Sequence, residues 1–228
     1  MKATVTMTIY LSYPLDPADP RPPAIPAPEL IPLYTIEKDG ASVHTLKIAS
    51  HTGTHVDTPA HVIAGGIPLE AFSPDEFVFT RPVVVDIQVA DDEIVQPDQL
   101  AVHGQVLSNA DLALLRFGYG GVRRGDPDRF CRHCPGLGVE SARWLRRTCP
   151  ELRALGMDVP SLACIAHLDR TMAAHNELLG GDGRRFLVIE DMNLDRDLTA
   201  LREVRLAPWL VRGMDSAPCS VVGLMEVN

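Results

Sequence analysis

Eight of the nineteen prolines lie between residues 14 and 32, and this cluster restricts the fold more than any other feature of the 228-residue chain. Each proline fixes its own φ angle and lacks an amide hydrogen, so the segment can be neither a helix nor a central strand. We therefore expect residues 14–32 to run extended over the surface. Because ordinary globular sequence flanks the segment, we expect an arm or lid on a single domain of residues 1–228.

The composition argues against several classes of function. A formal net charge of −9 is unfavourable for a nucleic-acid partner, and the densest basic pairs, Arg123-Arg124 and Arg146-Arg147, are too short to reverse this. No stretch approaches the roughly 18 consecutive apolar residues of a membrane span, and the N-terminus lacks the apolar run of a signal peptide. We expect a cytoplasmic protein, without a membrane partner, that acts on a small-molecule substrate.

The five cysteines are scattered along the chain. An odd number in a chain of this length predicts reduced thiols rather than a disulfide framework. Cys131 and Cys134 enclose His133 in a C-x-x-C pattern, but no second pair of ligands lies at a suitable spacing. We interpret them as loop thiols rather than as a zinc or redox site.

Hydrophobic patterning predicts an irregular alternation of strands and helices, which favours a mixed α/β or α+β domain. Helices are expected at 139–147, where acidic and basic residues match the helix dipole, and at 170–179, before Gly180-Gly181. Residues 162–165 fit either a short buried strand or a turn. Strands are expected over residues 1–10, 42–49, 83–89, 106–107, 111–116, 186–189 and 220–227.

Three of the eight histidines and an aspartate fall within residues 51–61, which read His-Thr-Gly-Thr-His-Val-Asp-Thr-Pro-Ala-His. The glycine, the proline and the β-branched residues oppose a helix, so we expect a turn that leads into an extended piece. There His55 and Asp57, two residues apart, point to one side. A bend at Gly53 lets His51 join them.

Neutral imidazole and ionised carboxylate are ligands that zinc, manganese and iron accept at neutral pH. Two histidines and one carboxylate leave coordination positions open, as in a catalytic site. His61 then serves either as a further ligand or as a free acid/base group, because a histidine pKa of about 6.5 suits proton transfer. The alternative is a polar loop whose side chains only hydrogen-bond one another, and four such residues at these spacings favour the metal.

The other histidines are weaker candidates. His44 lies in a strand-like run, His103 in a loop, and His167 follows apolar residues that fit a core position as well as a ligand. His175 is more informative because it lies on the second predicted helix. Glu177, Glu190 and Asp191 are available to share a cation with it.

The run from His51 to His61 fits throughout the His-x-Gly-Thr-His-x-Asp-x-Pro-x-His hallmark of the metal-dependent cyclase family, which includes bacterial kynurenine formamidases and isatin hydrolases. Weaker similarities lie at residues 11–15, 115–119, 135–145, 156–161 and 175–193. The resemblance implies an α/β domain of the swivelling β/β/α type, with mixed sheets and flanking helices. It also implies assembly as a homodimer or homotetramer.

The resemblance further implies a site of one or two divalent ions per subunit, zinc or manganese. His51, His55 and Asp57 would hold one metal. Asp57 would bridge to a second metal, completed by His175 and Glu190. His61 would be the catalytic acid/base.

The activity implied is hydrolysis of a formamide, lactam or lactone by a metal-activated water, with chemistry at C–N bonds other than peptide bonds. Two alternatives stay open: a metal-dependent cyclisation, dehydration or isomerisation in a biosynthetic pathway, and a non-catalytic protein that binds metal or ligand. Phe117 and Tyr119 replace the family's threonine and tryptophan, and residues 217–220 lack its arginine. Residues 180–185 are additional between His175 and Glu190. These departures imply an altered substrate pocket.

Overall fold

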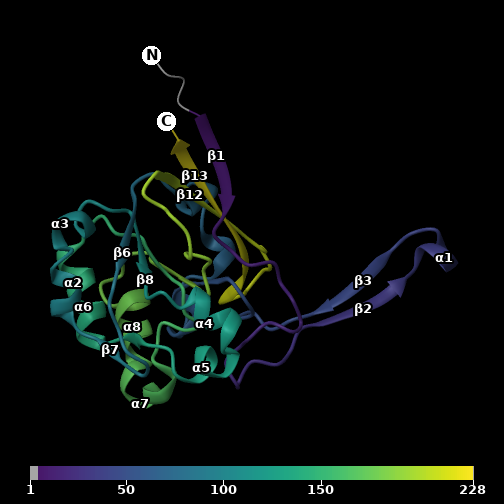
Figure 1. Ribbon diagram of the computed structural model, residues 1–228, viewed down its shortest axis with the longest axis horizontal. Coiled ribbons are helices and arrows are strands. Elements are labelled where there is room, and N and C mark those ends of the chain that lie inside the picture. The colour runs from purple at the N-terminus through teal and green to yellow at the C-terminus, as the bar shows by residue number, and fades with distance from the viewer. Residues whose placement is uncertain (1–4, 228) are drawn as a thin grey trace.

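The computed structural model of the protein describes residues 5–227, which are built on one mixed nine-stranded sheet (Figure 1). The strand order is β5-β12-β13-β4-β11-β10-β8-β6, and β1 also pairs with β13. These strands are β1 (Val5–Tyr10), β4 (His55–Asp57), β5 (Val78–Phe79), β6 (Pro82–Asp86), β8 (Leu112–Arg116), β10 (Ala154–Met157), β11 (Leu187–Glu190), β12 (Leu201–Pro208) and β13 (Ser216–Val227).

The parallel part of the sheet comprises β6, β8, β10 and β11, whereas β4 runs antiparallel to both of its neighbours, β11 and β13. Helices pack against the parallel strands: α2 (Pro97–Ala101), α3 (Gly104–Leu107), α5 (Pro127–Arg132), α6 (Val139–Thr148) and α8 (Ala173–Gly180) all contribute to one apolar cluster with them. The helices α4 (Gly120–Gly125) and α7 (Leu168–Thr171) complete this side, and a short pair, β7 (Ile94–Val95) with β9 (Gly136–Leu137), lies among them. The predicted α/β class, with mixed strands and flanking helices, is confirmed.

Both faces of the central strands are buried. In β8, Ala113 and Leu115 pack in the helical cluster, whereas Leu112 and Leu114 pack in a second cluster with residues of β12 and β13. Successive side chains of a strand point to opposite faces, so a strand covered on both sides reads as a continuous apolar run. This explains why the strands near residues 83–89 and 111–116 could be predicted from hydrophobicity.

A two-stranded hairpin projects away from this body (Figure 1). It consists of β2 (Glu29–Tyr34), the short helix α1 (Ile36–Asp39) and β3 (Val43–Lys47), and every residue of the two strands is exposed. We call residues 29–47 the arm. Residues 14–28 contain turns but neither helix nor strand, in agreement with the proline pattern. The single-domain organisation and a function of residues 14–32 as arm or lid stay predictions.

Several local predictions need correction. Val106 and Leu107 are not a strand but the end of α3, because the amides of Leu107 and Ser108 donate to the carbonyls of His103 and Gly104. The helix predicted at 170–179 is two helices, α7 and α8, that meet at Met172. Of the two alternatives for residues 162–165, the turn is confirmed, because these residues bend and enter a 3₁₀ helix. The strand predicted at 1–10 is described only from Val5 onward, and residues 1–4 lie outside the described part.

The cysteines are buried and free in the described residues. Cys131 lies within α5, so its prediction as a loop residue is wrong. Burial raises the pKa of the Cys134 thiol to about 12, which disfavours the thiolate that metal binding and redox exchange require. In residues 5–227 no helix has both the length and the apolar character needed to cross a bilayer.

Candidate metal centre

The backbone of residues 51–61 follows the course expected from the sequence. Residues 51–54 form a turn in which Gly53 has a φ of +62°, a left-handed conformation that glycine adopts without strain. The buried strand β4 follows, and then a 3₁₀ turn, Pro59–His61, that carries His61. The turn and the strand together deliver three histidines and one aspartate to one region.

Strand pairing brings distant residues beside β4. In β11, Glu190 pairs with His55 and Val188 with Asp57, whereas in β13 Ser216 pairs with Asp57. Side chains that face each other across a ladder lie on the same face of the sheet. This register places the carboxyl group of Glu190 directly beside the imidazole of His55.

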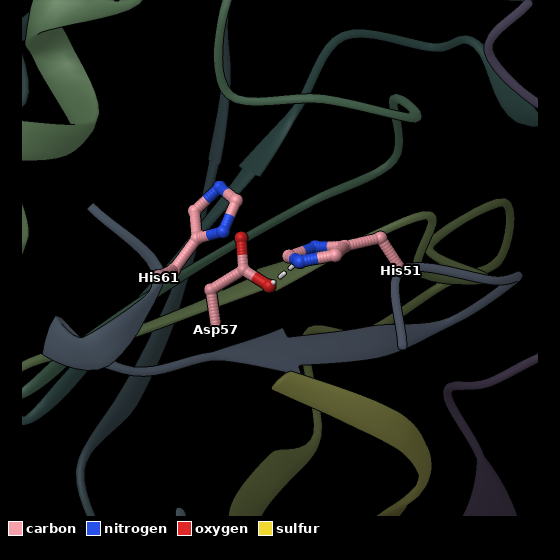
Figure 2. A group of neighbouring side chains, drawn as sticks. All are labelled: His51, Asp57 and His61. Atoms are coloured by element: carbon pink, nitrogen blue, oxygen red, sulfur yellow. Dashed lines mark ion pairs between the residues drawn. The ribbon is translucent and has the colours of Figure 1, made fainter. Parts of the chain in front are cut away.

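The side chains meet in two groups that share Asp57. In the first group, which contains His51, Asp57 and His61, Nδ1 of His51 lies 3.0 Å from Oδ1 of Asp57 (Figure 2). In the second, Nε2 of His55 lies 3.1 Å from Oε2 of Glu190 and 3.6 Å from Oδ1 of Asp57. The ligand atoms within each group all lie within 4.8 Å of one another.

His175 from α8 joins the second group, with its Nε2 3.3 Å from Oε1 of Glu190. The two other carboxylates considered for it are engaged elsewhere. Glu177 binds Arg143, and Asp191 binds Arg123. All five residues predicted as metal ligands therefore gather at one place, with Glu190 as the partner of His175.

The unpaired atoms of this cluster match the needs of a cation. Among residues 5–227, the buried atoms that lack a hydrogen-bond partner include Nε2 of His55 and both carboxylate oxygens of Asp57. Nε2 of His55 is within ion-pair distance of two carboxylates, but it is not aligned for a hydrogen bond. Its Nδ1–H donates to the carbonyl of Gly53 at 2.7 Å, so Nε2 presents a lone pair. Lone pairs that converge in a buried site fit a metal ion.

The electrostatics keep the buried carboxylates ionised. Burial acts to raise the pKa of Glu190, but the adjacent imidazoles of His175 and His55 hold this pKa well below its usual range. Burial also opposes the protonated form of His51, yet the nearby carboxylate of Asp57 and that of Asp215 raise the pKa of His51 to about 9. Ionised carboxylates are the state that binds a divalent cation.

Exposure divides the cluster into a closed and an open side. The side chains of His55, Asp57, His175 and Glu190 are at most 4% exposed, whereas those of His51 and His61 are 19% and 23% exposed. The ring centroid of His61 lies 4.3 Å from that of His51 and 5.5 Å from that of His175. A substrate can therefore approach the cluster from the side that carries His61.

Asp215 is a site residue that the sequence did not reveal. Its Oδ2 lies 2.9 Å from Nε2 of His51 and 3.3 Å from Nδ1 of His61. Its carbonyl accepts hydrogen bonds from the amide and hydroxyl of Thr58. The only local signal was a carboxylate just before the last predicted strand, and its approach to the histidines depends on the pairing of β13 with β4.

The remaining histidines do not join the cluster. His44 lies on the exposed strand β3, His103 precedes α3, and His167 ends a 3₁₀ turn. His133 faces Asp92 at the surface. The sequence-based ranking of the histidines therefore agrees with their positions.

The fold and this cluster define an α/β protein with a candidate metal centre. Residues 9–163 match the Cyclase family, and the chain belongs to that family. The matched region contains His51 to His61 but ends before His175, Glu190 and Asp215. The family resemblance seen in the sequence is confirmed.

Similar proteins agree with this placement. A kynurenine formamidase from Bacillus cereus is 26% identical over 187 residues, which cover 82% of this chain and 81% of that protein. Isatin hydrolase A from Labrenzia aggregata, solved with benzyl benzoate, superposes with a TM-score of 0.81 at 20% identity, over 97% of this chain and 94% of that one. Isatin hydrolase A from Ralstonia solanacearum superposes equally well at 21% identity, over 97% and 92% of the two chains. The fold is therefore that of the isatin hydrolases.

Proposed function

We propose that the protein is a metal-dependent hydrolase that cleaves the C–N bond of a formamide or cyclic amide, or the ester bond of a lactone. One observation carries the proposal: unpaired atoms of His55 and Asp57 converge with the carboxylate of Glu190 in a buried site, and a solvent-accessible histidine stands beside them. The kynurenine formamidase relative and the isatin hydrolase neighbours support this class of substrate.

His51, His55 and Asp57 would hold one divalent ion, zinc or manganese, and Asp57, His175 and Glu190 would hold a second. A bound divalent ion supplies Lewis acidity, which lowers the pKa of water and polarises a carbonyl. The Nδ1–H of His55 donates to the carbonyl of Gly53, and this bond fixes the ring with Nε2 toward the carboxylates. Asp57 is common to both groups, so the arrangement accommodates one or two ions.

In this proposal His61 moves the proton. Its Nδ1 faces Asp215, so an Nδ1–H can donate to that carboxylate while Nε2 accepts a proton from water. The oxygen of that water forms the new bond to the carbonyl carbon as the C–N bond breaks. His61 then returns the proton to the departing nitrogen. Asp215 orients the ring.

The test is turnover by metal-free protein reloaded with Mn²⁺ or Zn²⁺, assayed with a formanilide, isatin and a simple lactone. We expect hydrolysis of at least one compound and its loss on chelation. His61→Ala should lower kcat by about 10²- to 10⁴-fold, the usual contribution of general acid–base catalysis, without loss of metal. His133→Ala, which removes an exposed histidine at the end of α5, is the control. Full turnover by His61→Ala would refute the role of His61, and ring closure in place of hydrolysis would refute the reaction class.

We also propose a homo-oligomer in the cytoplasm. The five free, buried cysteines fit a reducing compartment. The arm supports self-association, because a lone two-stranded hairpin is marginally stable in water. Its apolar side chains are nevertheless uncovered: Leu30 is 47%, Ile31 46% and Leu33 58% exposed. A second copy of the chain would bury them.

A further inference from the structure

Arg123 from α4 is shared between two carboxylates that are distant in the sequence. Its Nε and Nη2 donate to the two oxygens of Asp191 at 2.7 and 3.0 Å. Its Nη1 and Nη2 donate to the two oxygens of Asp19 at 3.2 and 3.0 Å. The guanidinium also lies 3.9 Å above the ring of Tyr13. Arg123 therefore connects residues 13–19, at the start of the proline-rich segment, to Asp191.

Asp191 directly follows Glu190 and is held in an unusual backbone conformation. Its φ is +51°, in the left-handed region that few residues other than glycine occupy. Its amide donates to the carbonyl of Val159 at 2.8 Å, and its buried side chain is fixed by Arg123. A strained residue keeps its conformation only where its surroundings determine it. The contact with Arg123 thus fixes the end of β11, from which Glu190 reaches the metal centre.

A second connection runs between the same two regions. The hydroxyl of Thr54 donates to the carbonyl of Asp191 at 2.5 Å and accepts the amide of Tyr13 at 3.0 Å. Thr54 lies between Gly53 and His55 in the histidine run. Residues 13–19 therefore contact Arg123, which binds the residue after Glu190. They also contact Thr54, the residue before His55.

The two ion pairs of Arg123 differ in strength. The side chain of Asp191 is 5% exposed and that of Asp19 is 24% exposed, while Arg123 itself is 5% exposed. Solvent weakens the outer pair, whereas the inner pair cannot open without leaving a buried charge. The contact with Asp19 can therefore break while Arg123 stays bound to Asp191.

We propose that Asp19 and Arg123 are positioning residues for Glu190, and that docking of residues 13–19 is coupled to metal binding. This inference rests on the proposed role of Glu190 as a ligand. Coupling between two binding events is reciprocal. A docked segment tightens metal binding, and metal in turn orders the segment.

Asp19→Ala tests the coupling, because it removes the outer pair and leaves Arg123 bound to Asp191. The matched control is Asp195→Ala, which removes the exposed partner of Arg124, the next residue of α4. Two quantities are measured on the metal-free full chain. One is the Kd of Mn²⁺ by calorimetry, and the other is hydrogen exchange of peptides from residues 11–25 with and without Mn²⁺.

In the wild type and in Asp195→Ala, Mn²⁺ should slow exchange in these peptides. In Asp19→Ala, the affinity should fall about fivefold or more, within the usual range of coupling, and the metal should no longer slow exchange. Arg123→Lys should have the larger effect on affinity. If that variant fails to fold, Asp19→Ala alone decides.

Two results would overturn the proposal, and they are distinguishable. If Asp19→Ala loses the metal-dependent protection but binds Mn²⁺ like the wild type, the coupling is refuted and the metal centre stands. If the wild type binds neither Mn²⁺ nor Zn²⁺, the metal centre of the proposed function falls, and the coupling falls with it.

Discussion

The imidazole of His61 and the carboxylate of Asp215 lie 3.3 Å apart, although 154 residues separate them in the chain. The same oxygen of Asp215 lies 2.9 Å from His51. One carboxylate therefore orients both the proposed base and a proposed ligand. Partners of this kind fix the tautomer and the direction of a histidine ring.

Asp215→Asn should lower kcat by about 10- to 100-fold at saturating metal, the usual cost of losing such a partner. An amide can donate as well as accept, so it no longer fixes the tautomer of His61 in which Nδ1 carries the proton. Steady-state kinetics over a range of Mn²⁺ concentrations is the measurement. Asp197→Asn, at an exposed carboxylate that accepts from Thr199, is the control. An unchanged kcat in Asp215→Asn would remove Asp215 from the mechanism.

Metal affinity should increase with pH. In the metal-free protein the pKa of His51 is raised to about 9, so a proton must leave the ring before a metal can bind. Below pH 9 the apparent affinity should rise by up to tenfold per pH unit, and it should level off above. Calorimetry in buffers of different ionisation enthalpy would detect the released proton. Affinity independent of pH between 7 and 9 would contradict a role for His51 as ligand.

The raised pKa of His51 also predicts how the stability of the metal-free protein depends on pH. The folded pKa of His51 lies above its ordinary value of 6.5, so the protonated ring stabilises the folded state. This contribution is fully present below pH 6.5 and is lost as the pH rises through about 9. Urea unfolding of His51→Gln and wild type at pH 6 and pH 9.5 would measure it. The difference between the two proteins should shrink at the higher pH.

Metal stoichiometry should separate the two groups of ligands. Asp57 belongs to both groups, whereas Glu190 belongs to one. Asp57→Asn should therefore lose all bound metal. Glu190→Gln should bind one ion, whether the wild type binds two ions or one. Elemental analysis of protein loaded with Mn²⁺ would give the count. Full metal content in Asp57→Asn would rule out the site.

The arm should control assembly. Ile31→Asp combined with Leu33→Asp places two charges on the exposed apolar surface of β2, so it should convert a dimer or tetramer into a monomer. Val102→Asp, at a residue that is 79% exposed near α2, is the control. Light scattering after size-exclusion chromatography measures the mass. A monomeric wild type would contradict the proposed self-association.

Local sequence patterns predicted those strands and helices whose burial follows a simple period along the chain. The strand Leu187–Glu190 is buried on both faces and reads as an apolar run, and α6 shows helical spacing with matching charges at its ends. The strand prediction at Val106 and Leu107 was wrong because two apolar residues fit a helical turn as well as a strand. The strand order depends on contacts across more than a hundred residues, which no local pattern encodes.

The candidate site likewise contains residues that local patterns predict and residues that only strand pairing brings to the site. His51, His55, Asp57 and His61 could be predicted because their spacing and the glycine and proline between them are local. The sequence offered Glu177, Glu190 and Asp191 as partners of His175, and only the family resemblance selected Glu190. The structure brings His175 and Glu190 within 3.3 Å of each other. Asp215 was missed because its function depends on the register of β13. The extra residues 180–185 do not displace Glu190, since Gly180 ends α8 and residues 181–185 form a surface turn and loop before β11.

The position of β4 between β11 and β13 sets an order of events during synthesis. The histidine run is translated within the first 61 residues, but its strand forms hydrogen bonds with residues 188–190 and 216–218. We expect a nascent chain to bring Glu190 and Asp215 beside the histidine run only after β11 and β13 have left the ribosome. The complete set of proposed ligands would therefore form late in folding. A chain that folds when metal is scarce would gather the same acidic and histidine side chains with no cation between them.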